Sequence, residues 1–302
     1  MMKIMKNTFW AALVLVGLIS CDKNDDGPEP IPVRDPGEVQ VESDALLTEY
    51  LETHFYNYEE FENPPADFDY KLVFDTIAGD NSTKTSLIDR DELVTKTLNR
   101  QDVDYKLYVL KARVGAGEQP TFADSTRLTY RGNVVYDDLF DSAVTPTWLD
   151  LSNTIEGFSK SVNEFKGATD FTLNPDGTVT YSDDYGIGAV FIPTGLAYFN
   201  SGSGSIAPYD DIVFTFNVYG VNQTDHDNDG VPSYLEDVNG NKFLRDLVDD
   251  TDGDGIANYQ DEDDDNDGIP TRDEVVVNED GLVGFPDTDN DGTPDYLDAD
   301  TE

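Results

Sequence analysis

The sequence predicts an α+β fold, in which an antiparallel sheet surrounds one short helix and an extended acidic tail follows with little regular secondary structure. Between residues 105 and 221, segments with the alternating apolar pattern of strands flank a single segment with helical spacing. Of the net charge of −44 over 302 residues, −24 falls on residues 222–302, which hold 27 acidic and three basic side chains. In that tail an Asp-x-Asp-x-Asp-Gly pattern recurs.

The first 20 residues predict a signal peptide rather than a folded segment. Lys3 and Lys6 precede an apolar stretch, residues 9–19, that is too short to span a bilayer as a helix. The motif Leu18-Ile19-Ser20-Cys21 then matches a bacterial lipobox, so we expect Cys21, the one cysteine of the chain, to be lipidated and to anchor the protein in a membrane. The alternative is an ordinary signal peptide that happens to contain a cysteine.

Residues 21–42 are acidic and rich in proline, without apolar periodicity, and predict a flexible tether. The acidic run at its start, Asp22-Lys23-Asn24-Asp25-Asp26, resembles the surface-export signals of lipoproteins from Bacteroidota, with a simple solvated linker as the alternative. The resemblance implies an outer-membrane lipoprotein that faces either the periplasm or the cell surface.

An N-terminal extension of helical and mixed character is expected over residues 43–104. Residues 43–60 carry apolar side chains at helical spacing, and His54 among them is expected to be a packing residue. Residues 69–77 alternate like a strand, whereas residues 93–98 fit a helix or a strand equally.

The pattern over residues 105–221 predicts four strands and a short helix. We expect strands at residues 105–114, 125–131, 187–192 and 212–221, and the helix at residues 155–165. A turn at residues 115–120 and a loop at Asp137-Asp138 separate the earlier elements. Between the helix and the third strand, Asn174-Pro175-Asp176-Gly177 predicts a hairpin turn.

Short motifs follow one another through this domain in a distinctive order. They are Thr129-Tyr130-Arg131-Gly132, Phe140-Asp141-Ser142, Thr154-Ile155-Glu156-Gly157-Phe158, Phe191-Ile192-Pro193, Ala197-Tyr198, Ile206-Ala207-Pro208 and Ile212-Val213-Phe214. Together they resemble the FKBP-type peptidyl-prolyl cis-trans isomerases over about residues 105–221. The resemblance implies a curved, FKBP-like antiparallel sheet around a short helix, and an isomerase that acts on X-Pro bonds of exported proteins.

The resemblance also implies a role for each residue of the pocket. Phe158 corresponds to the pocket floor, and the walls around the proline ring correspond to Tyr130, Phe140, Ile155 and Phe214. Asp141 corresponds to a carboxylate near the reacting carbonyl, and Tyr198 to a hydroxyl that binds a substrate carbonyl. Ile206 lies in the loop over the pocket, where its backbone N–H is a second candidate donor to the substrate.

Three places depart from the family pattern. Phe158 stands where the family usually has tryptophan, about 20 residues are inserted around residues 171–185, and residues 199–205 are rich in glycine and serine. These places decide between an enzyme and a binding module that holds proline-containing segments without isomerising them, as a chaperone or adaptor would.

Prolyl isomerisation needs no nucleophile, metal or cofactor. The barrier to rotation, about 18–20 kcal/mol, exists because amide resonance must be broken, and a dry apolar pocket favours the less polar twisted amide. The acidity of the chain excludes electrostatic binding to nucleic acid or to an anionic membrane. A third reading makes the acidic tail the working part, as a spacer or adhesive stalk.

Four segments of the tail follow one template, with three alternating aspartates, a glycine and a carboxylate at the twelfth position. We call them loop 1 (residues 225–236), loop 2 (residues 250–261), loop 3 (residues 263–274) and loop 4 (residues 287–298). The expected ligands are Asp225, Asp227, Asp229, Glu236, Asp250, Asp252, Asp254, Asp261, Asp263, Asp265, Asp267, Glu274, Asp287, Asp289, Asp291 and Asp298. Alternating carboxylates on a tight loop suit structural Ca²⁺, which takes six to eight oxygen ligands.

Prolines shortly after the glycines exclude the flanking helices of EF-hands. The array therefore resembles thrombospondin type 3 repeats, which implies an extended chain that winds around bound calcium. The segment at Asp237 is a degenerate copy with fewer carboxylates, and His226, between two ligand positions, is expected to face solvent.

Overall fold

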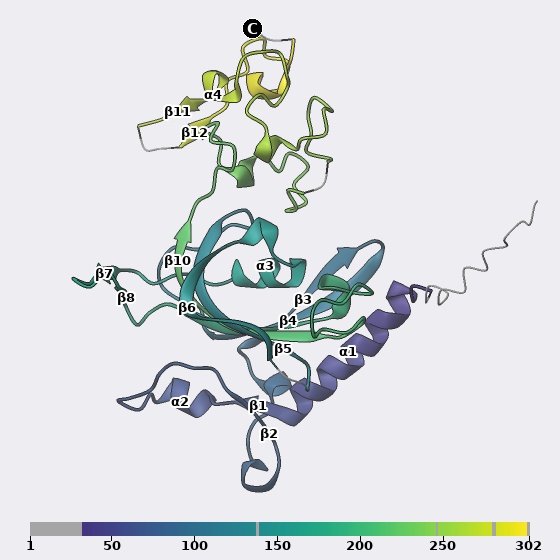
Figure 1. Ribbon diagram of the computed structural model, residues 1–302, viewed down its shortest axis with the longest axis vertical. Coiled ribbons are helices and arrows are strands. Elements are labelled where there is room, and N and C mark those ends of the chain that lie inside the picture. The colour runs from purple at the N-terminus through teal and green to yellow at the C-terminus, as the bar shows by residue number, and fades with distance from the viewer. Residues whose placement is uncertain (1–31, 137–138, 246, 280–281, 301–302) are drawn as a thin grey trace, which may run out of the picture. The chain divides into compact units, whose positions relative to one another are not determined.

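The computed structural model describes residues 32–136, 139–245, 247–279 and 282–300 (Figure 1). The predicted signal peptide, Cys21, the first part of the tether and the Asp137-Asp138 loop lie outside the described residues. The chain divides after Val33, and the second unit, Arg34–Glu302, carries every helix and strand described below. None of the helices in the described ranges combines the length and the apolar character that crossing a membrane requires.

The first helix begins earlier than the sequence predicted. Helix α1 spans Pro36–Thr53 and is followed by strand β1 (His54–Tyr56), helix α2 (Tyr58–Glu62) and strand β2 (Phe74–Thr76), which pairs antiparallel with β1. Asp35 caps α1, because its carboxylate accepts the Glu38 N–H at 3.0 Å, and Pro36 follows as the first helical residue. Residues 36–42 are therefore helical rather than part of a tether, and the helix expected to reach residue 60 ends at Thr53.

A six-stranded antiparallel sheet forms the centre of the structure. Its strands are β3 (Leu93–Arg100), β4 (Val103–Arg113), β5 (Ser125–Val134), β6 (Leu139–Asp150), β9 (Gly186–Ile192) and β10 (Ile212–Asn222), in the order β3-β4-β9-β10-β5-β6. Figure 1 shows the sheet curving around helix α3 (Glu156–Val162). This is the predicted fold class.

The four strands and the helix expected in residues 105–221 are all present, and two further strands join them. Residues 93–98, for which the sequence left helix and strand open, belong to β3, so the sheet begins before residue 105. Strand β6 was missed because it is an edge strand of the sheet and none of its side chains is buried, which removes the apolar alternation. The predicted Asn174–Gly177 turn joins β7 (Phe171–Leu173) to β8 (Val179–Tyr181).

Both faces of the sheet are covered, and the strands supply each face with alternate residues. Toward α1, the core holds Leu47, Leu51, Tyr108, Leu110, Phe191 and Val213. Toward α3, it holds Leu107, Val109, Phe158, Val162, Val190, Ile192 and Phe214. Strand β9 is therefore buried along its whole length. The close approach of α3 depends on Gly157, where a Cβ atom would lie 2.3 Å from Ile192 Cγ2.

The acidic tail has short elements only, as the sequence predicted. They are the 3₁₀ turns Ser233–Leu235, Asn258–Gln260 and Asp295–Leu297, helix α4 (Thr271–Glu274), and strands β11 (Val276–Val277) and β12 (Val283–Gly284), which pair antiparallel. Its apolar core is small: Leu244, Ala257 and Tyr259 pack with Ala123 of the preceding domain.

Candidate functional site

The seven apolar residues of the predicted pocket meet in one cluster on the α3 side of the sheet. They are Tyr130, Phe140, Ile155, Phe158, Tyr198, Ile206 and Phe214. They come from β5, β6, the start of α3, the segment after β9 and strand β10. Phe158, Ile206 and Phe214 are only 3%, 4% and 6% exposed, and the other four are half-buried. The cluster therefore has a buried centre and a half-exposed rim.

Phe214 lies at the centre of the aromatic rings. Its ring centroid is 5.0 Å from that of Phe158, 5.4 Å from that of Phe140 and 6.0 Å from that of Tyr130, in tilted or edge-on contacts. Gly132 leaves the space for this packing, because a Cβ atom there would lie 2.5 Å from the Phe214 ring and 2.6 Å from the Phe140 ring. The motifs that were expected to form a pocket thus meet in a contiguous apolar wall.

Polar groups lie at the rim of the cluster. The Tyr130 hydroxyl donates to Asp141 Oδ2 at 2.8 Å, and burial together with this hydrogen bond raises the pKa of Tyr130 to about 12. Burial and the charge of Asp141 also raise the pKa of Tyr198. Both hydroxyls therefore stay protonated at neutral pH. The Tyr198 hydroxyl forms no hydrogen bond with the residues that the structure describes, so it is an available donor beside the apolar wall.

The loop after Tyr198 is closed on itself. The Ile206 N–H donates to Ser203 O at 2.9 Å and the Ser203 N–H donates to Ile206 O at 2.9 Å. Gly202 and Gly204 make this tight turn possible, since both have positive φ, 60° and 59°. The Ile206 N–H is therefore used within its own loop in this arrangement, and its expected role as a donor to the substrate stays a prediction.

A buried acid joins this region to helix α1. Asp211 is 3% exposed, and its Oδ1 accepts the Thr194 N–H and the Ser43 hydroxyl, each at 2.7 Å. Burial raises the pKa of Asp211 to about 6. Thr194 opens the 3₁₀ turn Thr194–Leu196, which leads directly to Tyr198, so Asp211 positions the segment that carries the free hydroxyl. Asp211 was not among the expected site residues, although an acid between Pro208 and an apolar strand was a signal.

A hollow of about 510 Å³ lies on the other face of the sheet. Tyr50, His54, Phe74, Arg131 and Tyr136 are among its lining residues, and none of the eight predicted pocket residues is. His54 stacks on Tyr50 with centroids 3.9 Å apart and hydrogen-bonds Tyr50 O through Nδ1. That contact is the packing role expected from the sequence.

The four acidic loops share one backbone geometry. In each, the N–H of the ninth residue (Ser233, Asn258, Thr271 or Asp295) donates to the carbonyl oxygen just before the loop, at 2.7 to 3.0 Å. The fourth residue (Asn228, Gly253, Asn266 or Asn290) and the sixth (Gly230, Gly255, Gly268 or Gly292) all have positive φ. The degenerate copy at Asp237 keeps this form, with positive φ at Gly240 and Lys242.

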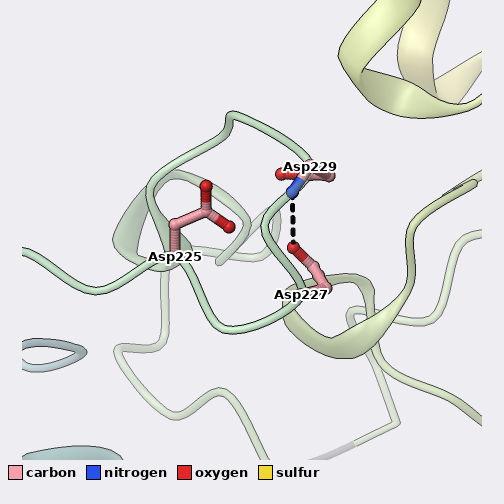
Figure 2. Close-up of side chains that lie close together, drawn as sticks. All are labelled: Asp225, Asp227 and Asp229. Carbon is pink, nitrogen blue, oxygen red and sulfur yellow. Dashed lines mark hydrogen bonds between the residues drawn. The ribbon is translucent and has the colours of Figure 1, made fainter.

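The first three aspartates of every loop gather as the template predicted. In each loop their ligand oxygens lie within 4.8 Å of one another, and Figure 2 shows Asp225, Asp227 and Asp229, with the Asp229 N–H donating to Asp227 Oδ1 at 3.2 Å. Two oxygens on one Ca²⁺ lie no farther apart than about 5.2 Å. Of the carboxylates at the twelfth position, Glu236 joins such a group among the described residues, whereas Asp261, Glu274 and Asp298 lie outside these groups.

Several of these carboxylates are buried without a hydrogen-bond partner, which fits a bound cation. Unpaired buried oxygens occur on Asp227, Asp229, Glu236, Asp263, Asp264, Asp265, Glu274 and Asp287. Burial and the neighbouring acids raise the pKa of Glu236 to about 10 and that of Asp264 to about 9. Buried carboxylates are normally paired with cations, and an all-oxygen donor set of this kind suits Ca²⁺. Asp264 was missed by the template, because it stands between two expected ligands.

His226 does not face solvent as expected. Its side chain is 15% exposed, Nδ1 lies 2.8 Å from Ser233 Oγ, and Nε2 lies 3.1 Å from Asp150 Oδ2. Burial acts to raise the pKa of Asp150, but hydrogen bonds from His226, Ser152 and Asn153 outweigh burial and lower that pKa to about 2. His226 thus contacts the end of strand β6 instead of solvent.

One family model matches part of the acidic tail. Residues 226–286 match the family model of the BamM C-terminal, not the thrombospondin type 3 repeats that the sequence predicted. A search of the curated proteins finds no match.

Solved structures similar to this chain include prolyl isomerases. A peptidyl-prolyl cis-trans isomerase from Pseudomonas syringae is 19% identical, with a TM-score of 0.34 over 45% of this chain and 84% of its own. FkpA from Escherichia coli is 20% identical, with a TM-score of 0.34 over 44% of this chain and 53% of its own. A multi-domain immunophilin from Arabidopsis thaliana is 17% identical, with a TM-score of 0.33 over 45% of this chain and 48% of its own. Similarity at this level carries no argument about activity, which depends on the site itself.

Proposed function

We propose that this protein is a peptidyl-prolyl cis-trans isomerase that acts on X-Pro bonds of exported proteins. The observation that carries the proposal is the meeting of all seven apolar pocket residues in one cluster, with the free Tyr198 hydroxyl and the Asp141 carboxylate at its rim. A proline ring is apolar and flat-sided, so it fits an aromatic wall, and its flanking carbonyls need donors.

The proposed mechanism uses desolvation and one hydrogen bond. The ring of a substrate proline packs on Phe158 and Phe214, where water is excluded and the twisted amide is favoured relative to the planar one. The Tyr198 hydroxyl donates to a substrate backbone carbonyl and holds the peptide while the bond rotates. Asp141 accepts from Tyr130, which fixes the Tyr130 ring as a wall. No proton is transferred.

Exchange spectroscopy by NMR on a short X-Pro peptide tests the proposal. Wild type should accelerate cis-trans exchange, and Tyr198→Phe should slow the catalysed rate by roughly 3- to 10-fold, the value of one net hydrogen bond. Tyr181→Phe is the matched control, because it removes the same hydroxyl from the β7–β8 hairpin and should leave the rate unchanged. Peptide binding with no acceleration of exchange would instead favour a proline-binding chaperone or adaptor.

We also propose that the chain is held in the outer membrane by a lipid on Cys21, on the periplasmic face or at the cell surface. The lipobox motif at residues 18–21 supports this. Cys21→Ser should move the protein from the membrane fraction to the soluble fraction of fractionated cells. Ser20→Ala, next to it, should leave the protein in the membrane. Membrane retention of Cys21→Ser would rule out the lipid anchor.

In the tail we propose structural Ca²⁺ in loops 1 to 4, held by the carboxylates at the first, third and fifth positions. The support is the grouping of those oxygens within 4.8 Å in every loop. When bound, the ions would neutralise part of the net charge of −24 on residues 222–302. They have no part in the proposed isomerase chemistry.

A further inference from the structure

The most deeply buried carboxylates of the tail come from two different loops. Asp229 and Glu236 belong to loop 1 and are both fully buried, and Asp264 belongs to loop 3 and is 2% exposed. One ligand oxygen from each lies within 4.8 Å of the others. The template places a ligand set inside each loop, so this group was not expected from it.

The oxygens of this group lack partners. Both carboxylate oxygens of Glu236, both of Asp264 and Oδ2 of Asp229 are buried without a hydrogen bond. Asp229 Oδ1 accepts the Val231 N–H at 2.7 Å, so only its second oxygen is available. Among the described residues, no lysine or arginine pairs with any of the three acids. Five unpaired buried oxygens on three carboxylates are costly unless a cation lies among them.

Asp264 differs from its counterparts at the second position of the other loops. There the side chain bonds within its own loop: His226 to Ser233 at 2.8 Å, Thr251 to Asn258 at 2.9 Å, and Thr288 to Asp295 at 2.7 Å. In loop 3 the backbone N–H of Asp264 keeps the equivalent bond, to Thr271 Oγ1 at 3.2 Å, while both carboxylate oxygens stay unpaired. The side chain is thereby left to meet loop 1.

We propose that Asp229, Glu236 and Asp264 bind the Ca²⁺ ion of loop 1, so that this one ion ties loop 1 to loop 3. The inference rests on the proposed calcium binding by the tail, and it adds a ligand and a link between loops to that proposal. Three carboxylates supply the hard oxygen donors that Ca²⁺ prefers, and their burial excludes the competing water. The ion makes the two loops fold as one unit.

Calcium titration of the full-length protein by calorimetry tests the shared site. Asp264→Asn should weaken one binding step by roughly tenfold or more, because the number of charged ligands sets calcium affinity. Asp273→Asn is the matched control: it removes the same charge from an exposed side chain of loop 3 and should bind like wild type. Terbium provides a second readout, because a tyrosine near a bound terbium ion sensitises its emission. Tyr296 is buried, and it lies close enough to Asp264, Glu236 and Asp229 for their charges to raise its pKa. Tyrosine-sensitised terbium emission should therefore fall in Asp264→Asn and persist in Asp273→Asn.

A double variant shows whether the two loops share one ion. If Asp229 and Asp264 bind the same ion, Asp229→Asn, Asp264→Asn and the double variant should all weaken the same binding step, and the other steps should stay unchanged. Losses in two different binding steps, or an unchanged titration of Asp264→Asn beside a wild type that binds calcium, would overturn the shared site and leave calcium binding intact. A wild type that takes up no calcium would overturn both proposals. The near-ultraviolet circular dichroism of the aromatic cluster verifies that each variant is folded.

Discussion

At the scale of single residues, Asp211 makes the stability of the fold beside the pocket depend on pH. Its carboxyl is buried between α1 and the segment leading to Tyr198, and burial raises its pKa to about 6, although hydrogen bonds from Ser43 and Thr194 act in the opposite direction. The adjacent Asp210 raises it further. The folded state therefore holds the proton to higher pH than the unfolded chain does.

The change Asp211→Asn should remove this dependence. In wild type the contribution of Asp211 to the free energy of unfolding is full below the ordinary aspartate pKa of about 3.9 and is lost as pH rises through about 6. The loss is on the order of 3 kcal/mol, at about 1.4 kcal/mol per tenfold change in proton affinity. Asparagine keeps an Oδ1 acceptor for Ser43 and Thr194 but has no proton to lose. The free energy of unfolding of the variant should therefore rise relative to that of wild type as pH rises.

Urea unfolding of both proteins at fixed calcium, from pH ~4.5 to ~7.5, measures this difference. The acidic tail titrates equally in the two proteins, so it cancels when they are compared. Parallel stability curves for wild type and Asp211→Asn would contradict the assignment.

At the scale of elements, α1 is the clearest difference between local sequence and structure. Residues 36–42 have the composition of a linker, yet Asp35 and Pro36 start a helix there, and its far half packs Leu47 and Leu51 against the sheet. Residues 36–42 lack a clear apolar periodicity. They are nevertheless helical, because a capping aspartate and a first-turn proline start the helix and tertiary contacts hold the rest of it.

A pair of valine variants tests whether residues 36–42 belong to the folded part. Val39 is 2% exposed and Val41 is 70% exposed, two positions apart on α1. Val39→Ala should lower the free energy of unfolding by about 1–3 kcal/mol, from lost burial and a small cavity. Val41→Ala should change it by less than about 0.5 kcal/mol. Equal, negligible effects in thermal unfolding would mean that the segment is a tether after all.

At the scale of the whole molecule, the sheet domain and the acidic tail are stabilised in different ways. The sheet domain is held by two apolar cores, whereas the tail buries few apolar side chains and many acidic ones. Like charges at this density oppose compaction unless cations offset them. The tail should therefore fold only with its ions, while the sheet domain folds through apolar burial.

Removing calcium should expand the tail and leave the sheet domain folded. A segment of about 80 residues has a radius of gyration of about 12 Å when compact and about 28 Å when unfolded. Small-angle scattering with calcium and then with excess chelator should detect this expansion, and the aromatic circular dichroism of the sheet domain should stay constant. Identical scattering curves in the two conditions would show that the ions are not what compacts the tail.

Much of the fold could be predicted from the local sequence pattern. The predictions that were wrong or missing concern elements whose burial the local pattern does not record. The strands at residues 105–114 and 187–192 were predictable because their alternation reports burial directly. Strand β6 was not, because an exposed edge strand has no such alternation. The extent of α1 was misjudged because its stabilising partners lie far away in sequence.

The sequence by itself determined the members of the aromatic cluster, through its resemblance to a known family, and the backbone form of the acidic loops, through residue type and short spacing. Only the tertiary structure decided how they are used. It pairs the Ile206 N–H within its own loop, leaves the Tyr198 hydroxyl without a hydrogen bond to any described residue, and brings Asp264 of loop 3 to Glu236 of loop 1. These are contacts between separate segments, and their geometry follows from the packing of the whole chain, which no local pattern records.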